Sequence, residues 1–344
     1  MSAYPNAYHY LRIATENPSA PGTPVAPQKG IRYESFDPGV NKEEDEDKGA
    51  SGSKNPLINI DITRAYSEPN FTDRLRFDDA LGYFLKHYYG TDVVTRNIPS
   101  TGLSYSHAFA EAASLDTATL TEGFNVGSET AKTMSGCQCN SLEFKFSLDA
   151  APRITASYIG GYRVHGATEP SLTYATTRPA QAGQIDVYCD AYGGTIGSTL
   201  LPGVREISLT LNNGLTAVAE AADDFGETSI DQDLVSITGS LTRRYDGTDY
   251  ERIFDTGSDS GTTPTTEPLE KLLRVKYTGP MIETIYPYIF QLDILRANVK
   301  VKSPRGMEGM KTEEWEIKGL ANASGLSSAA LLQNKIATYE YIAP

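Results

Sequence analysis

The chain has 344 residues, and its 44 acidic and 30 basic side chains give a formal net charge of -14. Because 39% of the residues are apolar and only 22% are charged, the chain can bury enough apolar surface to offset the entropy lost on ordering, which excludes wholesale disorder. The acidic balance argues against specific nucleic-acid recognition, since neutralising phosphates requires clustered Lys and Arg. The length predicts about two domains.

The N-terminal residues 1–13 contain no basic segment followed by an apolar one, and no window approaches the roughly 18 apolar residues of a membrane helix. We therefore expect neither a signal peptide nor a helical membrane anchor. Three cysteines, Cys137, Cys139 and Cys189, cannot all pair with one another. These features predict a reduced protein that is made inside a cell.

Two segments near the N-terminus, residues 17–30 and 37–54, have the composition of loops. The second contains a run of five carboxylates: Glu43, Glu44, Asp45, Glu46 and Asp47. Adjacent carboxylates repel one another and are costly to bury, so the favoured interpretation is a solvated loop. The alternative is a long hairpin arm. Residues 255–268 are also predicted to form a loop.

The first predicted helix follows a strand over residues 59–66. Asp78 or Asp79 is placed to cap this helix, and Gly90 supplies the left-handed residue that ends it. Apolar residues between the caps recur at helical spacing: Leu81, Phe84, Leu85 and Tyr88. The pattern predicts a short amphipathic helix.

Several segments alternate between apolar and polar residues with a period of two, which is typical of antiparallel strands that are wet on one face. The residues expected on their buried faces are Leu142, Phe144, Phe146 and Leu148; Ile207, Leu209 and Leu211; Ile237 and Leu241; Leu273, Val275 and Tyr277; Phe290, Leu292 and Ile294; and Val299 and Val301.

A second short helix is predicted after a strand over residues 236–245. Asp246 is its expected cap and Gly257 its expected end. Its apolar stripe consists of Tyr250, Ile253 and Phe254.

Three features recur in the same order in the two halves of the chain, which predicts a diverged internal duplication. Each helix follows a strand, and later in each half comes a similar strand, at residues 142–145 and 315–318. The predicted fold class is mainly β, with two tandem β-barrels or sandwiches, each flanked by a short α-helix. The expected domains are residues 1–170 and 203–344, with a linker or bridging segment at 171–202.

Residue types that carry catalysis or bind metals lack the required spacing. Four histidines are scattered along the chain: His9, His87, His107 and His165. His87 is expected on the outer part of the first helix, beside Lys86. Cys137 and Cys139 have no second pair of Cys or His nearby, so we predict no metal site. We likewise predict no cofactor and no enzyme activity.

Motifs in three parts of the chain resemble those of one protein family. Glu16 is followed by Gly22-Thr23-Pro24, a strand and an acidic-capped helix span residues 234–254, and two strands lie within residues 136–160. Together these motifs resemble the major tail tube proteins of long-tailed, non-contractile (siphovirus-type) phages and archaeal tailed viruses. The acidic insertion at residues 41–54 departs from the family pattern.

The resemblance implies a structural virion protein made in the host cytoplasm, whose rings stack into the tail tube and conduct DNA into the host. Relatives with two barrels are similar to trimers that mimic a sixfold ring, and this chain fits that form. Its implied partners are other copies of itself, the tail terminator, the tail tip and tape-measure proteins, and viral DNA bound without sequence specificity. The net charge predicts a negative lumen, which does not grip DNA.

The acidic segment is expected to reach the adjacent ring and to become ordered there. Glu43, Glu44, Asp45, Glu46 and Asp47 would then meet basic residues of that ring. We predict Lys300 and Lys302 as these partners. The alternative is a solvated loop that stays mobile on the outside of the tube.

Two other classes of protein remain as alternatives. An outer-membrane barrel also has alternating strands, but it requires a signal peptide and aromatic girdles, which the sequence lacks. A secreted β-sandwich that binds carbohydrate requires aromatic platforms, whereas the only tryptophan, Trp315, is expected in the core.

Overall fold

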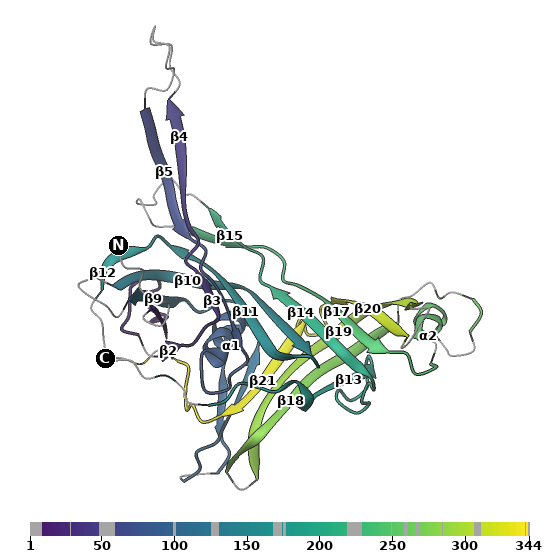
Figure 1. Ribbon diagram of the computed structural model, residues 1–344. Helices are drawn as coiled ribbons and strands as arrows, with labels where there is room; N and C mark the ends of the chain where they lie inside the picture. The colour runs from purple at the N-terminus through teal and green to yellow at the C-terminus, as the bar shows by residue number, and fades with distance from the viewer. Residues whose placement is uncertain are drawn as a thin grey trace.

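The computed structural model of the chain is rich in β-strands and has two short α-helices (Figure 1). It describes residues 9–27, 29–47, 59–98, 101–124, 131–167, 174, 177–218, 229–248, 250–257, 261–263, 265, 269–283, 285–305, 311–340 and 342. The mainly β fold class is therefore confirmed. Within these residues no helix is long and apolar enough to cross a membrane.

One antiparallel sheet, which we call the long sheet, contains strands from both halves of the chain. In spatial order its strands are β3 (Ser35–Asp37), β6 (Asn70–Arg74), β11 (Ala150–Gly161), β10 (Ala131–Ser147), β14 (Val204–Asn212), β17 (Ser236–Arg244), β20 (Thr312–Gly319) and β19 (Tyr286–Arg305). The pairing of β10 with β14 joins the two halves.

Each of the two longest strands, β10 and β19, continues into a side sheet. The N-terminal part of β10 pairs with β9 (Ala118–Phe124) and β12 (Val164–Ala167), and β9 leads to β1 (His9–Thr15) and β2 (Lys29–Ile31). The N-terminal part of β19 pairs with β18 (Glu270–Glu283) and β21 (Ser328–Asn334). Beyond these lie β13 (Ile185–Ala191), next to β18, and then β8 (Tyr105–Ala110) and β7 (Val93–Arg96), next to β21.

Glycine permits β10 to pass from one sheet into the other. The pairing with β9 shifts between Met134 and Cys137, and Gly136 lies between them with a φ of 64°. Residues with a Cβ rarely adopt this conformation, so glycine is suited to such an irregular point in a strand. The two long strands thereby tie the side sheets to the long sheet.

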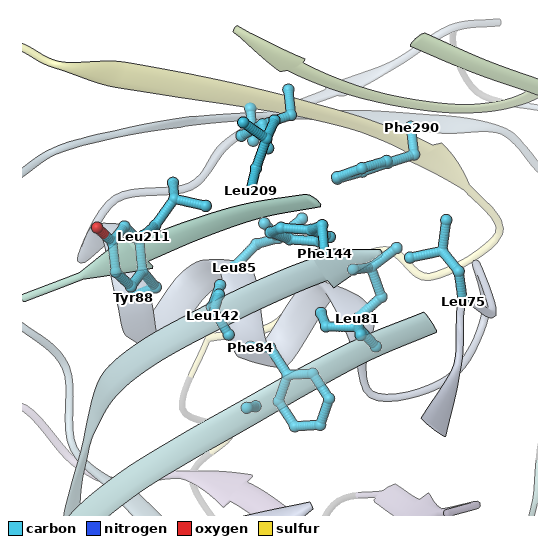
Figure 2. Packing of buried hydrophobic residues seen from close by; sticks show 14 of the residues in the cluster. Leu75, Leu81, Phe84, Leu85, Tyr88, Leu142, Phe144, Leu209, Leu211 and Phe290 are labelled. Carbon is cyan, nitrogen blue, oxygen red and sulfur yellow. The ribbon is translucent and has the colours of Figure 1, made fainter. Parts of the chain in front are cut away.

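The residues predicted for the buried faces are buried in every strand that was named, except Leu148 and Val301, which is only partly buried. Leu148 is 52% exposed, because it lies in the tight turn between β10 and β11, past the last residue of the strand. The core continues across both halves of the chain, since the ring centroids of Phe144 and Phe290 lie 5.2 Å apart. Figure 2 shows the first helix packed beneath this cluster.

Helix α1 (Leu81–Tyr89) ends as predicted, at Gly90 with a φ of 77°. Its predicted cap is wrong, because the residue before the helix is Ala80 and no side chain caps it. Asp78 is instead held by distant groups: its carboxylate accepts hydrogen bonds from the hydroxyls of Thr177 and Tyr288.

Helix α2 (Tyr250–Thr256) also ends at its predicted glycine, Gly257, with a φ of 77°. Asp246 accepts a hydrogen bond from the backbone nitrogen of Thr248 at 3.0 Å, in the turn that leads to the helix. Phe254 packs edge-on against Trp315 with ring centroids 5.4 Å apart. Trp315 is 0% exposed, which confirms that it belongs to the core.

A hairpin of β4 (Val40–Asp47) and β5 (Asn59–Ser67) projects from the body, and we call it the arm (Figure 1). The favoured interpretation of the acidic run as a loop is therefore wrong, and the hairpin alternative is confirmed for these residues. Glu43 and Glu44 are exposed on this ribbon, so these two carboxylates are not buried. Residues 48–58, which include the rest of the loop predicted at 37–54, lie outside the described residues.

The remaining elements are a small hairpin of β15 (Leu215–Val218) and β16 (Ser229–Gln232) and a 3-10 turn, η2 (Ala182–Gln184). No sheet closes as a barrel among the described strands. The segment predicted as a linker, residues 171–202, contains β13, which pairs with β18. The last strand, β21, pairs with β8 of the first half, so the two halves share their sheets at two places.

Candidate assembly surfaces

The arm is held at its base by the long sheet. β5 pairs with the end of β11, where Tyr66 lies opposite Gly161. The side-chain amide of Asn41 donates a hydrogen bond to Glu68 at 2.9 Å. Next to them Gly39 has a φ of 53°, and a Cβ there would lie 2.1 Å from the carbonyl oxygen of Glu68. The base of the arm therefore has a fixed direction relative to the body.

The acidic residues that the sequence singled out follow one another along β4. Glu43 lies opposite Arg64 and forms an ion pair with it, Oε1 to Nη1 at 3.4 Å. The guanidinium of Arg64 also lies over the ring of Tyr66, 4.5 Å from its centroid. The other four residues lie along the same strand: Glu44 opposite Ile62, Asp45 opposite Asp61, Glu46 opposite Ile60 and Asp47 opposite Asn59.

Lys300 and Lys302 lie on the last part of β19, at the end of the long sheet away from the arm. Both side chains are exposed, and the Nζ of Lys302 lies 2.6 Å from the Oε1 of Glu316 on the neighbouring strand. Lys302, with a smaller effect of Lys300, lowers the pKa of Glu316. Within one chain the structure does not bring these lysines to the acidic run, so their contact between rings stays a prediction.

One face of the long sheet is polar across strands of both halves, and we call it the wet face. One row that crosses it consists of Thr72, Thr155, Glu143, Thr210, Thr238 and Lys318, and the next of Arg74, Arg153, Lys145, Ser208, Ser240, Glu316 and Lys300. The residues between these positions, such as Phe144 and Leu209, are buried on the opposite face. Sequence alternation predicted the individual strands, but not the order that aligns their polar residues.

The wet face does not carry the acid excess of the chain. Its basic residues are Arg74, Arg153, Lys145, Arg244, Lys318, Lys300 and Lys302, and its acidic residues are Glu34, Asp37, Glu143, Glu206, Glu314 and Glu316. Several of these charges are paired: Glu34 accepts from Arg74 at 2.7 Å and from Arg153 at 2.9 Å, and Lys145 lies 2.8 Å from Glu143. Such a surface is close to neutral and rich in hydroxyl groups.

Glu16, the first residue of the family-like N-terminal motif, has a structural role. The side chain is 1% exposed, and its carboxylate accepts hydrogen bonds from the backbone nitrogens of Gly22 and Gly136, at 2.7 and 2.8 Å. It also accepts a hydrogen bond from the hydroxyl of Thr119 at 2.8 Å. One carboxylate thereby fixes the Pro-rich loop to β9 and to the irregular point of β10.

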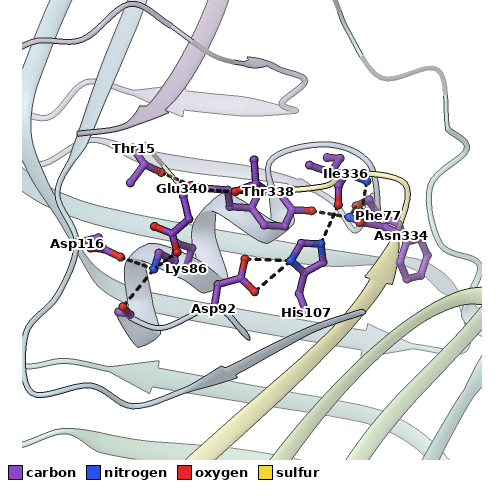
Figure 3. A network of polar contacts seen from close by, with 12 residues as sticks. Thr15, Phe77, Lys86, Asp92, His107, Asp116, Asn334, Ile336, Thr338 and Glu340 are labelled. Atoms are coloured by element: carbon purple, nitrogen blue, oxygen red, sulfur yellow. Dashed lines mark hydrogen bonds and ion pairs between the residues drawn. The ribbon is translucent and has the colours of Figure 1, made fainter. Parts of the chain in front are cut away.

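The segment after β21 folds back over α1 through a polar network, which we call the C-terminal clasp (Figure 3). Lys86 on α1 forms ion pairs with Asp116 at 3.0 Å and Glu340 at 2.7 Å. The imidazole of His107 contacts both carboxylate oxygens of Asp92 through Nδ1 and the carbonyl oxygen of Ile336 through Nε2. Sequence reasoning missed this clasp, because residues 335–340 carry no periodic pattern.

The predicted position of His87 on the outside of α1 is wrong, since the side chain is 0% exposed. The hydroxyl of Thr15 donates to the carbonyl of Tyr339 at 2.6 Å, so it accepts from Nε2 of His87 at 3.0 Å. Nδ1 then accepts from the hydroxyl of Tyr158 at 3.1 Å. Burial, together with the nearby charge of Lys86, lowers the pKa of His87 to about 3. The ring is thus neutral and structural.

The other residues considered for chemistry are not assembled into a site. Cys137, Cys139 and Cys189 are free, and the first two are fully buried, which raises the pKa of both thiols. His165 is exposed, while His9 lies 3.5 Å from Glu122. Within the described residues, no group of His, Cys, Asp and Glu side chains is arranged to hold a metal ion.

The fold and these surfaces define a β-rich structural protein with exposed polar sheets and a projecting hairpin. The model of the phage tail tube protein family matches residues 58–270. The chain therefore belongs to the phage tail tube protein family, a family of structural components of the virion tail rather than of enzymes. No curated protein matches the chain.

Proposed function

We propose that this chain assembles into stacked rings of the viral tail tube and that the wet face of the long sheet lines the channel for DNA. One observation carries the proposal: polar rows cross the strands of both halves without interruption. Among the described strands, the sheet ends at β3 on one side and at the last part of β19, beyond its pairing with β18, on the other. A wall of hydroxyl groups and paired charges offers DNA few free cations, so contacts are weak and independent of sequence. A carbohydrate-binding sandwich is not favoured.

Family membership and the strand pairings together support an internal duplication. In the first half the pairings run β1–β9–β10–β11–β6–β3, with β12 also beside β10. In the second half they run β13–β18–β19–β20–β17–β14, with β21 beside β19. The order of the elements along the chain also matches. The arm takes the place of the β15–β16 hairpin, and α1 takes the place of α2.

This correspondence changes which segments are equivalent. Residues 142–145 lie on β10 and residues 315–318 on β20, whereas the equivalent of β10 is β19. We therefore assign the boundary between the repeats to the segment before β13, within the proposed linker at 171–202. Residues 1–170 would then supply one unit and the chain from β13 onward the other, so the second unit begins before the expected bound at 203, and three chains form a ring with pseudo-sixfold symmetry.

The same proposal extends to the partners of the tube. Copies of the chain form the rings. The tail terminator, the tail tip and the tape-measure proteins contact the tube. Viral DNA passes through it, in phages of the siphovirus type or in their archaeal relatives. If the wet face lines the lumen, the wall has mixed charge, and the negative lumen expected from the net charge would require the acid excess to face inward elsewhere.

Electron microscopy and native mass spectrometry of the purified full chain test the proposal. We expect stacked rings with sixfold appearance and a ring mass of three chains of 37.3 kDa each. Rings of six chains would contradict the duplicated form, and a protein that stays monomeric at high concentration would contradict the tube.

We also propose that the arm reaches the next ring and that its acidic run meets Lys300 and Lys302 there. Deleting residues 41–53 should then yield isolated rings in place of tubes. A matched variant that keeps the hairpin but replaces Glu43, Glu44 and Glu46 by Gln and Asp45 and Asp47 by Asn separates charge from shape. Tubes of normal length from the deletion variant would show that the arm is dispensable for stacking.

A further inference from the structure

The two longest strands differ in what covers their second flank. β10 pairs with β11 along one flank, and along the other it pairs with β9 as far as Cys137 and then with β14 from Ser141 onward. β19 pairs with β20 along one flank, and along the other with β18 only as far as Asn298. Beyond that point residues 299–305, which we call the open flank, face no strand among the described residues.

β3 lies at the opposite end of the long sheet and pairs only with β6 among the described strands. In the proposed repeats β3 is the equivalent of β14, since each precedes a hairpin and pairs with the strand that follows that hairpin. β14 is the strand that covers β10, so its equivalent, β3, is the strand that fits the open flank of β19. The width of the long sheet separates the two within one chain.

Burial at the two ends of the long sheet supports a missing neighbour. At the contact of β10 with β14, the facing residues Phe144 and Leu209 are 0% and 1% exposed. On the open flank Val301 points to the core side, opposite Trp315, yet it is only partly buried. Phe36 on β3 likewise faces Phe71 and is only partly buried. Pairing of the two ends would cover both side chains.

The charges at the two ends are complementary. Lys300 and Lys302 are exposed on the open flank. Asp37 is exposed on β3, whereas Glu34, directly before this strand, is already paired with Arg74 and Arg153. Opposite charges across neighbouring strands stabilise their pairing, whereas like charges oppose it. A second copy of this chain therefore offers the open flank a strand of suitable shape and charge.

We propose that β3 of one copy pairs antiparallel with the open flank of β19 in the next copy, repeating between chains the contact that β10 and β14 make within one chain. This inference rests on the proposed ring and names the surface that closes it. Each copy carries one open flank and one β3, so the contact is head-to-tail and closes after a fixed number of copies. It also covers strand edges that would otherwise attract other chains.

Two matched variants test this pairing in the full chain. Val301→Lys blocks the open flank and Phe36→Lys blocks β3, because a lysine that points to the core side opposes the addition of a strand. Native mass spectrometry should find each variant as a monomer of about 37 kDa. In an equal mixture, the intact β3 of the first variant meets the intact flank of the second, so a dimer of twice that mass should form and nothing larger.

Rings of wild-type size from either variant alone, or a mixture that stays monomeric, would overturn the proposal. Lys318→Glu, an exposed charge change one strand inside the same edge, serves as the control and should still form rings. Circular dichroism of each variant checks that loss of rings is not loss of folding. If a variant fails to fold, Asp37→Cys on one copy with Lys300→Cys or Lys302→Cys on the other provides the second test, because both lysines are exposed on the flank. A disulfide-linked dimer from either pair supports the contact, and its absence from both contradicts it.

The same experiments distinguish this inference from the proposed function. If the wild type and both blocked variants form tubes, the proposed function is supported, but the pairing of β3 with the open flank is wrong. If the wild type forms no ring at all, the proposed function itself fails.

Discussion

The two helices occupy equivalent places in the proposed repeats, yet one is part of the core and the other lies at the surface. All nine residues of α1 are buried, whereas Phe254 is the buried residue of α2. α1 packs on β10 on one side and is covered by the C-terminal clasp on the other (Figures 2 and 3). α2 packs on Trp315 and has no such cover among the described residues. The C-terminal clasp, rather than the sequence of the helix itself, therefore accounts for the greater burial of α1.

Truncating the central phenylalanine of each helix should give the largest difference. Phe84 is 3% exposed and stacks on Phe71 with ring centroids 5.0 Å apart. Phe84→Ala should therefore cost about 3–5 kcal/mol of the free energy of unfolding. Phe254→Ala should cost less than the lower end of that range, because the surface helix can relax into the space. Urea denaturation of unassembled subunits measures both, and equal losses would contradict the comparison.

Gly82 tests the cover of α1 directly. A Cβ at this position would lie 1.9 Å from Cζ of Tyr339, which the clasp holds in place. Gly82→Ala should therefore displace Tyr339 and cost about 1–3 kcal/mol, although alanine favours the helix by itself. Thermal unfolding gives the cost, and faster hydrogen exchange in residues 335–340 shows where it arises. Stabilisation by this change would mean that the clasp is loosely attached.

The buried His87 makes the stability of the α1 region depend on pH. Its pKa is lowered to about 3 in the folded state, while the unfolded chain takes up the proton near pH 6.5. The unfolded state therefore binds more protons between pH 6.5 and 3, and stability falls as the pH is lowered, by up to about 1.4 kcal/mol per pH unit. His87→Gln should flatten this slope in a series of urea denaturations at different pH values.

Asp79 has the opposite effect on the pH dependence of stability, because its buried carboxylate destabilises the folded state when it is ionised. Burial raises its pKa to about 6 from an ordinary value of 3.8, so the folded state binds the extra proton between these values. Above pH 6 the buried, ionised carboxylate lowers the free energy of unfolding, and below pH 4 this destabilisation is absent. Asp79→Asn should thus raise stability at pH 7 and steepen the decline caused by His87 in acid. A variant that is less stable than the wild type at pH 7 would contradict this account.

Exposed positions on α2 should give the smallest effect. Arg252 is exposed on this helix. Arg252→Ala should change the free energy of unfolding by no more than about 0.5 kcal/mol. A larger loss of the free energy of unfolding in unassembled subunits would show that another segment covers the exposed face of α2.

The sequence predicted what depends on local periodicity and missed what depends on distant partners. Alternation identified β10, β14, β17, β18 and β19, because each has one wet and one buried face, and Gly90 and Gly257 marked the helix ends. It missed β1, which is buried along almost its whole length. The cap prediction for α1 failed because Asp78 binds the hydroxyl of Tyr288, 210 residues away. The clasp was missed for the same reason, since His107 and Ile336 are 229 residues apart.

The candidate assembly surfaces were predicted only in part. Charge identified the acidic run, but repulsion between carboxylates did not exclude a strand, since Glu43 and Glu44 stay exposed on β4 and Glu43 pairs with Arg64. Lys300 and Lys302 were recognised as a basic pair, whereas Glu316, which neutralises part of their charge, belongs to a different strand. The wet face depends on strand order, and the neighbours β10 and β14 are not consecutive in the chain.

The C-terminal clasp also sets the timing of folding during synthesis. Thr15 and Tyr339 form a hydrogen bond although they are 324 residues apart, so a ribosome must reach residue 339 before α1 can be covered. Until then the growing chain exposes the apolar face that the last strand and the clasp will bury, and such contacts form slowly because they are so distant in sequence. A nascent subunit is therefore not yet in the shape that can join a tube, which delays polymerisation until residues 335–340 have been made.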